Sequence, residues 1–114
     1  MRRIGAVALV VLSLAAGSVQ AASFNCTRAR TADEKAICAD RTLNDKDVRM
    51  ALLFDVSRHF LAMGRRGALE DAQTEWLKGR HACGANKQCL NGAYDHRIAA
   101  LQSVIDEVAT HGPF

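Results

Sequence analysis

The four cysteines constrain the fold of this sequence more than any other feature. They fall into two groups along the chain, Cys26 with Cys38 and then Cys83 with Cys89. Two histidines, His81 and His96, flank the second group in the stretch WLKGRHACGANKQCLNGAYDHR. Two sulfurs and two ring nitrogens make a ligand set that zinc accepts. The second group therefore belongs either to a metal site or to a disulfide framework.

Residues 1–21, MRRIGAVALVVLSLAAGSVQA, have the layout of a secretory signal peptide. Two arginines precede an apolar run of about a dozen residues, whereas a membrane-spanning helix needs roughly 20. Val19 and Ala21 supply the small residues that signal peptidase requires. We therefore predict cleavage after Ala21 and a mature domain of residues 22–114.

The residue before the first cysteine argues against a lipid anchor. A bacterial lipoprotein carries a small residue immediately before its lipidated cysteine, whereas Asn25 precedes Cys26 here. We therefore predict a periplasmic or secreted protein with no stable membrane anchor after signal cleavage. Loss of Arg2 and Arg3 lowers the formal charge from +3 to +1, which leaves no broadly basic surface for nucleic acid.

Export favours disulfides over zinc. All four cysteines lie in the predicted mature part, and an even number of cysteines in an oxidising compartment is typical of a disulfide framework. Four cysteines allow three connectivities, and the sequence alone leaves these open. We expect local pairing, because a bond between Cys83 and Cys89 would clamp the turn-forming segment GANKQ between two helices. Neither a metal nor another cofactor is expected.

The first helix is predicted from a capping box. In this motif Thr31 and Glu34 each bond to the other's backbone amide, which starts a helix near residue 32 and carries it to about residue 40. We expect this helix to bury Ile37 and its neighbours and to expose a charged face of three residues, Asp33, Glu34 and Lys35.

Three longer helices follow, and no segment alternates like a strand. The second covers RTLNDKDVRMALLFDVSRHFLAMG and is expected to end in MGRRG, because Gly64 and Gly67 suit helix ends and turns. The third is expected over residues 67–82, with one stripe formed by Leu69, Ala72, Gln73, Trp76, Leu77 and Arg80. The fourth is expected over 87–110, with an apolar stripe of Leu90, Tyr94, Ile98, Leu101, Ile105 and Val108. The sequence thus predicts an all-α, disulfide-stapled bundle of about four helices.

The motifs of common catalytic centres are missing. The chain has no Gly-x-Ser-x-Gly elbow, no phosphate-binding loop and no His-Glu-x-x-His helix. The cysteines are expected to be paired, so none is predicted to act as a nucleophile. We therefore predict that the protein is not an enzyme.

Five segments in order resemble the LprI-type domain, a family named for a lysozyme inhibitor: SFNC, TADEKAIC, LNDKD, QTEWLKGRHAC and CLNGAYDHRIAAL. The resemblance covers Ser23 to about Leu101. It implies a small exported helical domain with paired cysteines and a role in blocking lysozyme. Besides the cysteines, it marks a set of family-pattern residues, namely Glu34, Lys35, Asp47, Gln73, Trp76, Arg80, Tyr94 and Arg97.

The family-pattern residues have a physical explanation that needs no ligand. Trp76 and Tyr94 are expected to fill the core, with the indole nitrogen bonded to a partner. Arg80 and Arg97 are each expected to pair with a carboxylate such as Asp47 in a partly buried network. The marked residues then describe a scaffold, and an inhibitory surface would lie in the loops.

Two functions remain open. The first is a muramidase inhibitor that blocks the substrate cleft, with a cation placed between the cleft carboxylates. The candidate cations are Arg65 and Arg66, in the predicted turn between the second and third helices, and Lys87, in the corner between the two later cysteines. The alternative is a periplasmic interaction or structural module that binds another envelope protein and has no lysozyme target.

Overall fold

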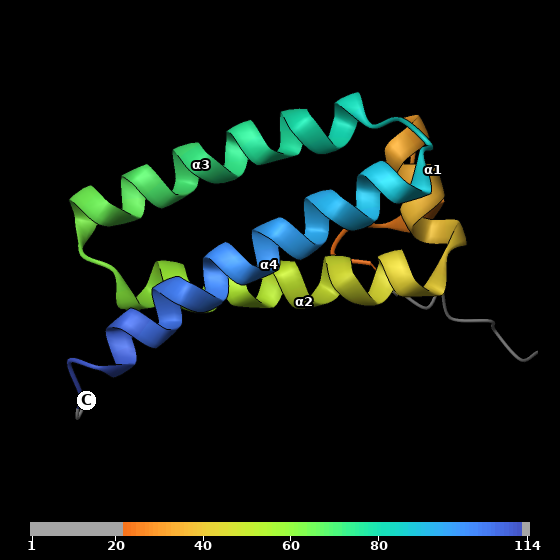
Figure 1. Ribbon diagram of the computed structural model, residues 1–114. Helices are drawn as coiled ribbons and strands as arrows, with labels where there is room; N and C mark the ends of the chain where they lie inside the picture. Colours follow the sequence, from red (N-terminus) through yellow and green to blue (C-terminus); the bar gives the residue numbers. More distant parts are fainter. Residues whose placement is uncertain (1–21, 113–114) are drawn as a thin grey trace, which may run out of the picture.

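The computed structural model describes residues 22–112, and the predicted signal peptide lies outside these residues. The described part is helical, without strands, so the predicted all-α fold is confirmed (Figure 1). The elements are a short 3-10 helix η1 (Cys26–Arg28) and four α-helices, α1 (Ala32–Ala39), α2 (Arg41–Phe60), α3 (Met63–Ala82) and α4 (Lys87–Ala109).

Two long helices form the main layer, and α3 returns above them. Figure 1 shows α2 and α4 running in the same direction, with α3 antiparallel to both and the short α1 at the end where α2 and α4 begin. The core between them is apolar and includes the completely buried Ile37, Leu43, Leu90, Tyr94 and Leu101.

Side chains at the helix starts explain where the helices begin. The Asp40 carboxylate accepts from the Leu43 amide at 3.1 Å, and the Asn86 side chain accepts from the Cys89 amide at 3.0 Å, so both cap free amides of a first turn. Thr31 occupies the predicted cap position of α1, but the reciprocal capping box is absent. Instead its hydroxyl donates to the Glu34 carboxylate at 2.8 Å.

The prediction that the second helix ends in a turn at MGRRG is wrong. The second helix ends at Phe60, and Leu61 and Ala62 are extended, with ψ angles of 142° and 162°. Helix α3 then begins at Met63, so the two arginines of this segment lie in its first turn. Burial of Leu61 fixes the change of direction, and neither glycine of the segment has a positive φ angle.

Both disulfides join neighbours in sequence, as expected. Cys26 is bonded to Cys38 with a Cα–Cα distance of 5.7 Å, and Cys83 is bonded to Cys89 with a Cα–Cα distance of 5.6 Å. The first ties η1 to α1, and the second closes the turn between α3 and α4. Because these sulfurs are bonded to each other, they offer no thiolate to a metal, and the zinc alternative loses its sulfur ligands.

The face of α3 toward the core is narrower than predicted. Leu69 and Gln73 are buried, and Trp76 and Arg80 are partly buried, at spacings of four, three and four residues. Ala72 and Leu77 are exposed, since one line of side chains reaches α2 and α4 while their neighbours point to the sides.

Candidate functional site: a buried polar network and an exposed corner

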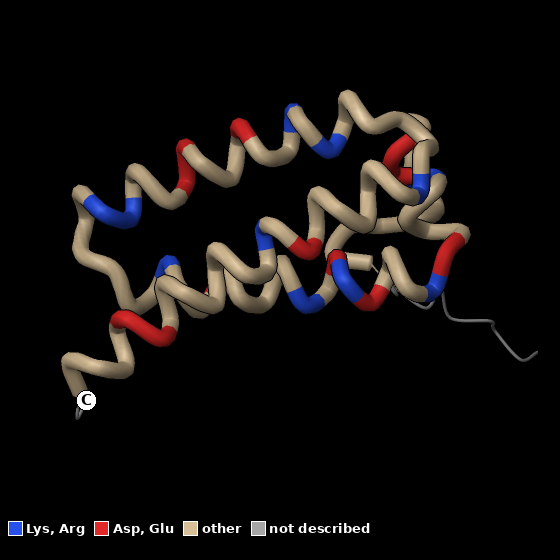
Figure 2. The backbone as a smooth tube through the Cα atoms, viewed as in Figure 1, with Lys and Arg blue, Asp and Glu red and all other residues tan. Residues whose placement is uncertain are grey.

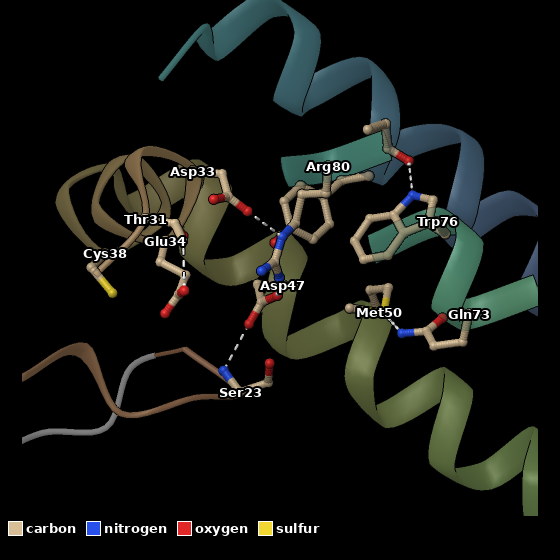
Figure 3. Close-up of polar contacts among 12 residues, drawn as sticks. Ser23, Thr31, Asp33, Glu34, Cys38, Asp47, Met50, Gln73, Trp76 and Arg80 are labelled. Atoms are coloured by element: carbon tan, nitrogen blue, oxygen red, sulfur yellow. Dashed lines mark hydrogen bonds and ion pairs between the residues drawn. The ribbon is translucent and has the colours of Figure 1, made fainter. Parts of the chain in front are cut away.

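A buried ion pair joins α1 to α3. The Arg80 Nε donates to Asp33 Oδ2 at 2.9 Å, and the two side chains are only 12% and 1% exposed (Figure 3). Asp33 was predicted to lie on a charged outer face of α1, and this prediction is wrong. Arg80 lies 47 residues further along the chain, and its guanidinium is the partner that makes burial of the Asp33 carboxylate possible.

Asp47 is the second buried carboxylate of this network. It accepts from the Tyr94 hydroxyl and from the Ser23 amide, both at 2.7 Å, and an Arg80 Nη1 lies 3.7 Å away. The predicted pairing of Arg80 with Asp47 is therefore present, although Asp33 is the closer partner. Asp47 also holds the start of the described chain against α2 (Figure 3).

The surroundings of Asp33 and Tyr94 shift the pKa values of both groups. Burial by itself would raise the pKa of Asp33, but the hydrogen bond from Arg80 and the charge of Arg80 outweigh it, so the pKa lies below its ordinary value. Burial raises the pKa of Tyr94, and the neighbouring charge of Asp47 raises it further. The interior therefore holds Asp33 charged and the Tyr94 hydroxyl protonated.

Trp76 lies at the centre of the aromatic packing. Its indole Nε1 donates to the Ala93 carbonyl at 2.9 Å, which supplies the expected partner. Its ring meets Tyr94 edge to face with centroids 5.1 Å apart. The Arg80 guanidinium lies 6.0 Å from the Trp76 ring and 5.6 Å from the Phe24 ring, within the range of cation–π attraction.

The prediction that Arg97 pairs with a carboxylate is wrong. Its Nε donates to Gln73 Oε1 at 2.9 Å, and the Gln73 amide donates to the Met50 sulfur at 3.2 Å. Within residues 22–112 its Nη2 has no hydrogen-bond partner, and burial lowers the pKa of this guanidinium. Gln73 accepts without contributing a charge, so the network on this side is neutral apart from the arginine.

The family-pattern residues thus serve the scaffold almost without exception. Asp47 and Tyr94 are completely buried, Gln73 and Arg97 nearly so, and Glu34 accepts from the cap residue of α1. Only Lys35 is exposed. Sequence reasoning missed Asp33 and the Ser23 amide, because each acquires its role from a residue far away along the chain.

The three candidate cations do not gather in one place. Arg65 and Arg66 lie at the end of the molecule where α2 meets α3, and Lys87 lies at the opposite end, where α4 begins (Figure 1). Arg65 is paired with Glu107 at 3.1 Å and Lys87 with Asp40 at 3.3 Å. The Arg66 guanidinium donates to the Leu61 carbonyl at 3.3 Å and has no carboxylate within ion-pair distance in residues 22–112.

Two exposed apolar side chains and Arg66 share the α2–α3 corner, defined here as residues 58–66. Met63 is 87% exposed and Phe60 is 52% exposed. A hollow of about 280 Å³ beside the corner is lined by Arg58, His59, Arg66 and Glu70, so three of its four lining residues are basic. The corner therefore combines exposed apolar side chains with a polar hollow that contains two arginines and one glutamate.

These features define a small disulfide-bonded helical domain with a buried polar scaffold and an exposed corner. The chain is 33% identical over 94 residues to the proteins called lipoprotein LprI from Mycobacterium bovis and Mycobacterium tuberculosis, and the match covers 80% of this chain. This similarity supports an LprI-like family for the chain, as its motifs indicated.

The match covers 45% of each relative, so the chain spans less than half the length of these curated proteins. No protein-family model matches the chain, and no solved structure matches it significantly. Within residues 22–112, none of the helices combines the length and the apolar character needed to cross a membrane.

Proposed function

We propose that residues 22–114 form an exported lysozyme inhibitor that blocks the substrate cleft sterically after residues 1–21 are removed. The kinship with proteins named lipoprotein LprI supports an inhibitor rather than an enzyme, since the resemblance implies lysozyme inhibition. The two disulfides support export, because such bonds persist in oxidising compartments.

The observation that carries this proposal is the composition of the α2–α3 corner. A lysozyme cleft holds two carboxylates on either side of the bond that is cut. Arg66 offers a guanidinium without a carboxylate partner among the described residues, and Met63 offers an apolar side chain beside it. Arginine and large apolar side chains in exposed positions are typical anchors of protein interfaces.

The three candidate cations differ in the partners that they would have to leave before binding a lysozyme. Arg65 and Lys87 would each have to leave a carboxylate before binding another, which offsets part of the gain. Arg66 would give up only a bond to a backbone carbonyl. We therefore assign the cleft contact to Arg66, supported by Met63.

A clearing assay of bacterial cell walls tests this function. Dose-dependent slowing of several lysozymes is expected from the oxidised protein and not from a reduced and alkylated sample. Arg66→Glu and, separately, Met63→Asp are expected to raise the half-inhibitory concentration by about tenfold or more, as loss of an interface anchor does. Lys87→Glu makes the same charge change at the other end and is the matched control.

Two outcomes of the same assay would contradict the proposal in whole or in part. Full activity of all lysozymes at micromolar excess of the oxidised protein would remove the inhibitor proposal and favour the envelope interaction module. Equal inhibition by Arg66→Glu, Met63→Asp and Lys87→Glu would keep the inhibitor and reject the corner as its contact surface. Far-UV circular dichroism of each variant confirms that the helices are intact.

A further inference from the structure

The outer face of α2, defined here by Asp45, Val48, Arg49 and Leu52, lies on the side of the helix away from the core. Val48 is 45% exposed and Leu52 is 61% exposed, and the two are one helical turn apart. They are two of the five large apolar side chains that are exposed within residues 22–112. An apolar pair on a surface helix is a feature of interaction surfaces when a suitable groove lies beside it.

Such a groove lies between α2 and α4. It has a volume of about 550 Å³, and Ile98 and Ala99 of α4 contribute apolar surface to it. Thr42 lines it from the first turn of α2, and Gln102 from α4. The groove can therefore accept apolar side chains from a second molecule along the first half of α2.

Two charges on the outer face also line this groove. Asp45 and Arg49 are exposed and lie one turn apart, yet neither forms an ion pair or a side-chain hydrogen bond within the described part of the chain. Their neighbour Lys46 is engaged, with its Nζ 2.7 Å from Asp95 and 3.0 Å from Asn91. Acidic and basic positions alternate along this half of α2 (Figure 2).

We propose that this face binds a second copy of the chain, with the two α2 helices antiparallel across a two-fold axis near residue 47. A two-fold interface requires that if one residue contacts another, the reverse contact also exists. Asp45 of each copy then faces Arg49 of the other, which pairs all four charges. The same register sets Leu52 of each copy opposite Thr42, where the groove of the other copy begins.

Self-complementarity is the reason for choosing a second copy over a different protein. The acid and the base line the groove, and the exposed leucine follows Arg49 by three residues on the same helix. The buried area is small, so the dimer is expected to be at the weak end of specific complexes. The α2–α3 corner lies beyond the far end of this interface and stays uncovered.

Sedimentation equilibrium of the oxidised protein, produced from the full-length sequence, tests the dimer over micromolar to millimolar concentrations. A monomer–dimer equilibrium is expected. Arg49→Asp opposes like charges on both sides of the axis and is expected to raise the dissociation constant by about tenfold or more. The double variant Asp45→Arg with Arg49→Asp exchanges the charges and is expected to restore it.

Two further variants locate the interface. Leu52→Glu is expected to abolish the dimer, whereas Arg28→Asp, an exposed arginine of η1, is expected to leave it unchanged. A monomer at every concentration would overturn the proposal and leave the groove to a different partner. A dimer that tolerates both Arg49→Asp and Leu52→Glu would overturn it as well, because its interface would lie elsewhere. Neither result bears on lysozyme inhibition.

Discussion

Asp33 is a carboxylate that the fold buries and keeps charged. Its neighbours on α1, Glu34 and Lys35, remain at least partly accessible, while Asp33 turns inward to Arg80 of α3. A buried ion pair of this kind is weak evidence of net stability, but removal of one partner leaves an uncompensated charge. The pair therefore specifies how α1 docks on α3.

Asp33→Asn is expected to lower the free energy of unfolding by about 3 kcal/mol, because Arg80 loses its closest carboxylate in a largely dry site. Urea denaturation monitored by circular dichroism measures the change. Asp55→Asn is the matched control, since this exposed carboxylate lies 3.8 Å from Arg58 and is expected to contribute less than about 1 kcal/mol. Equal losses in the two variants would contradict the role given to Asp33.

At the scale of the elements, packing and not the local sequence pattern decides where α2 ends and α3 begins. Glycines favour turns, so MGRRG was expected to end a helix, yet the chain turns at Leu61 because this side chain is buried. Gly67 has a helical backbone inside α3, and an added Cβ there would meet nothing within 4 Å. Gly84 differs, since its φ angle of +56° is a conformation that favours glycine.

Gly67→Ala is therefore expected to stabilise the protein by about 0.5 to 1 kcal/mol, because alanine is the better helix former. Gly84→Ala is expected to destabilise it by about 1 kcal/mol, owing to the strain of a side chain at positive φ. Thermal unfolding of the two variants with intact disulfides measures both effects. Opposite signs support the observed helix boundary, and destabilisation by both would argue for a turn at Gly67.

The number of the helices and the bounds of α4 follow from local patterns, whereas the α2–α3 boundary and the polar network do not. The apolar spacing of α4 predicted its bounds closely, and the turn GANKQ predicted the second disulfide. The burial of Asp33 and the neutral partner of Arg97 depend on contacts 47 and 24 residues apart. No periodic pattern encodes such pairs, because each arises from how two helices cross.

For the whole molecule, Asp33 and Tyr94 make stability depend on pH at opposite ends of the range. The folded pKa of Asp33 lies below the ordinary value of 3.8 expected in the unfolded chain, so its contribution is complete above pH 3.8 and is lost as the pH falls through the folded value. The folded pKa of Tyr94 lies above 10.0, so its contribution is complete below pH 10 and declines as the pH rises further.

Urea denaturation across this range is expected to give a plateau with an acidic and an alkaline decline. Asp33→Asn is expected to lessen the acidic decline and leave the alkaline one, and Tyr94→Phe is expected to do the reverse. The exposed control Asp55→Asn is expected to leave both unchanged. An alkaline decline that is as steep in Tyr94→Phe as in the parent protein would assign it to other groups.

The hydrogen bond from the Ser23 amide to Asp47 fixes the start of the described chain to α2 at the position of Asp47. Phe60 lies thirteen positions after Asp47 in α2, a length of about 20 Å at 1.5 Å per residue. A linker or solid support joined upstream of Ala22 thus meets the domain far from residues 58–66. Attachment through that side orients the molecule on a sensor surface with its exposed Met63 toward the solution.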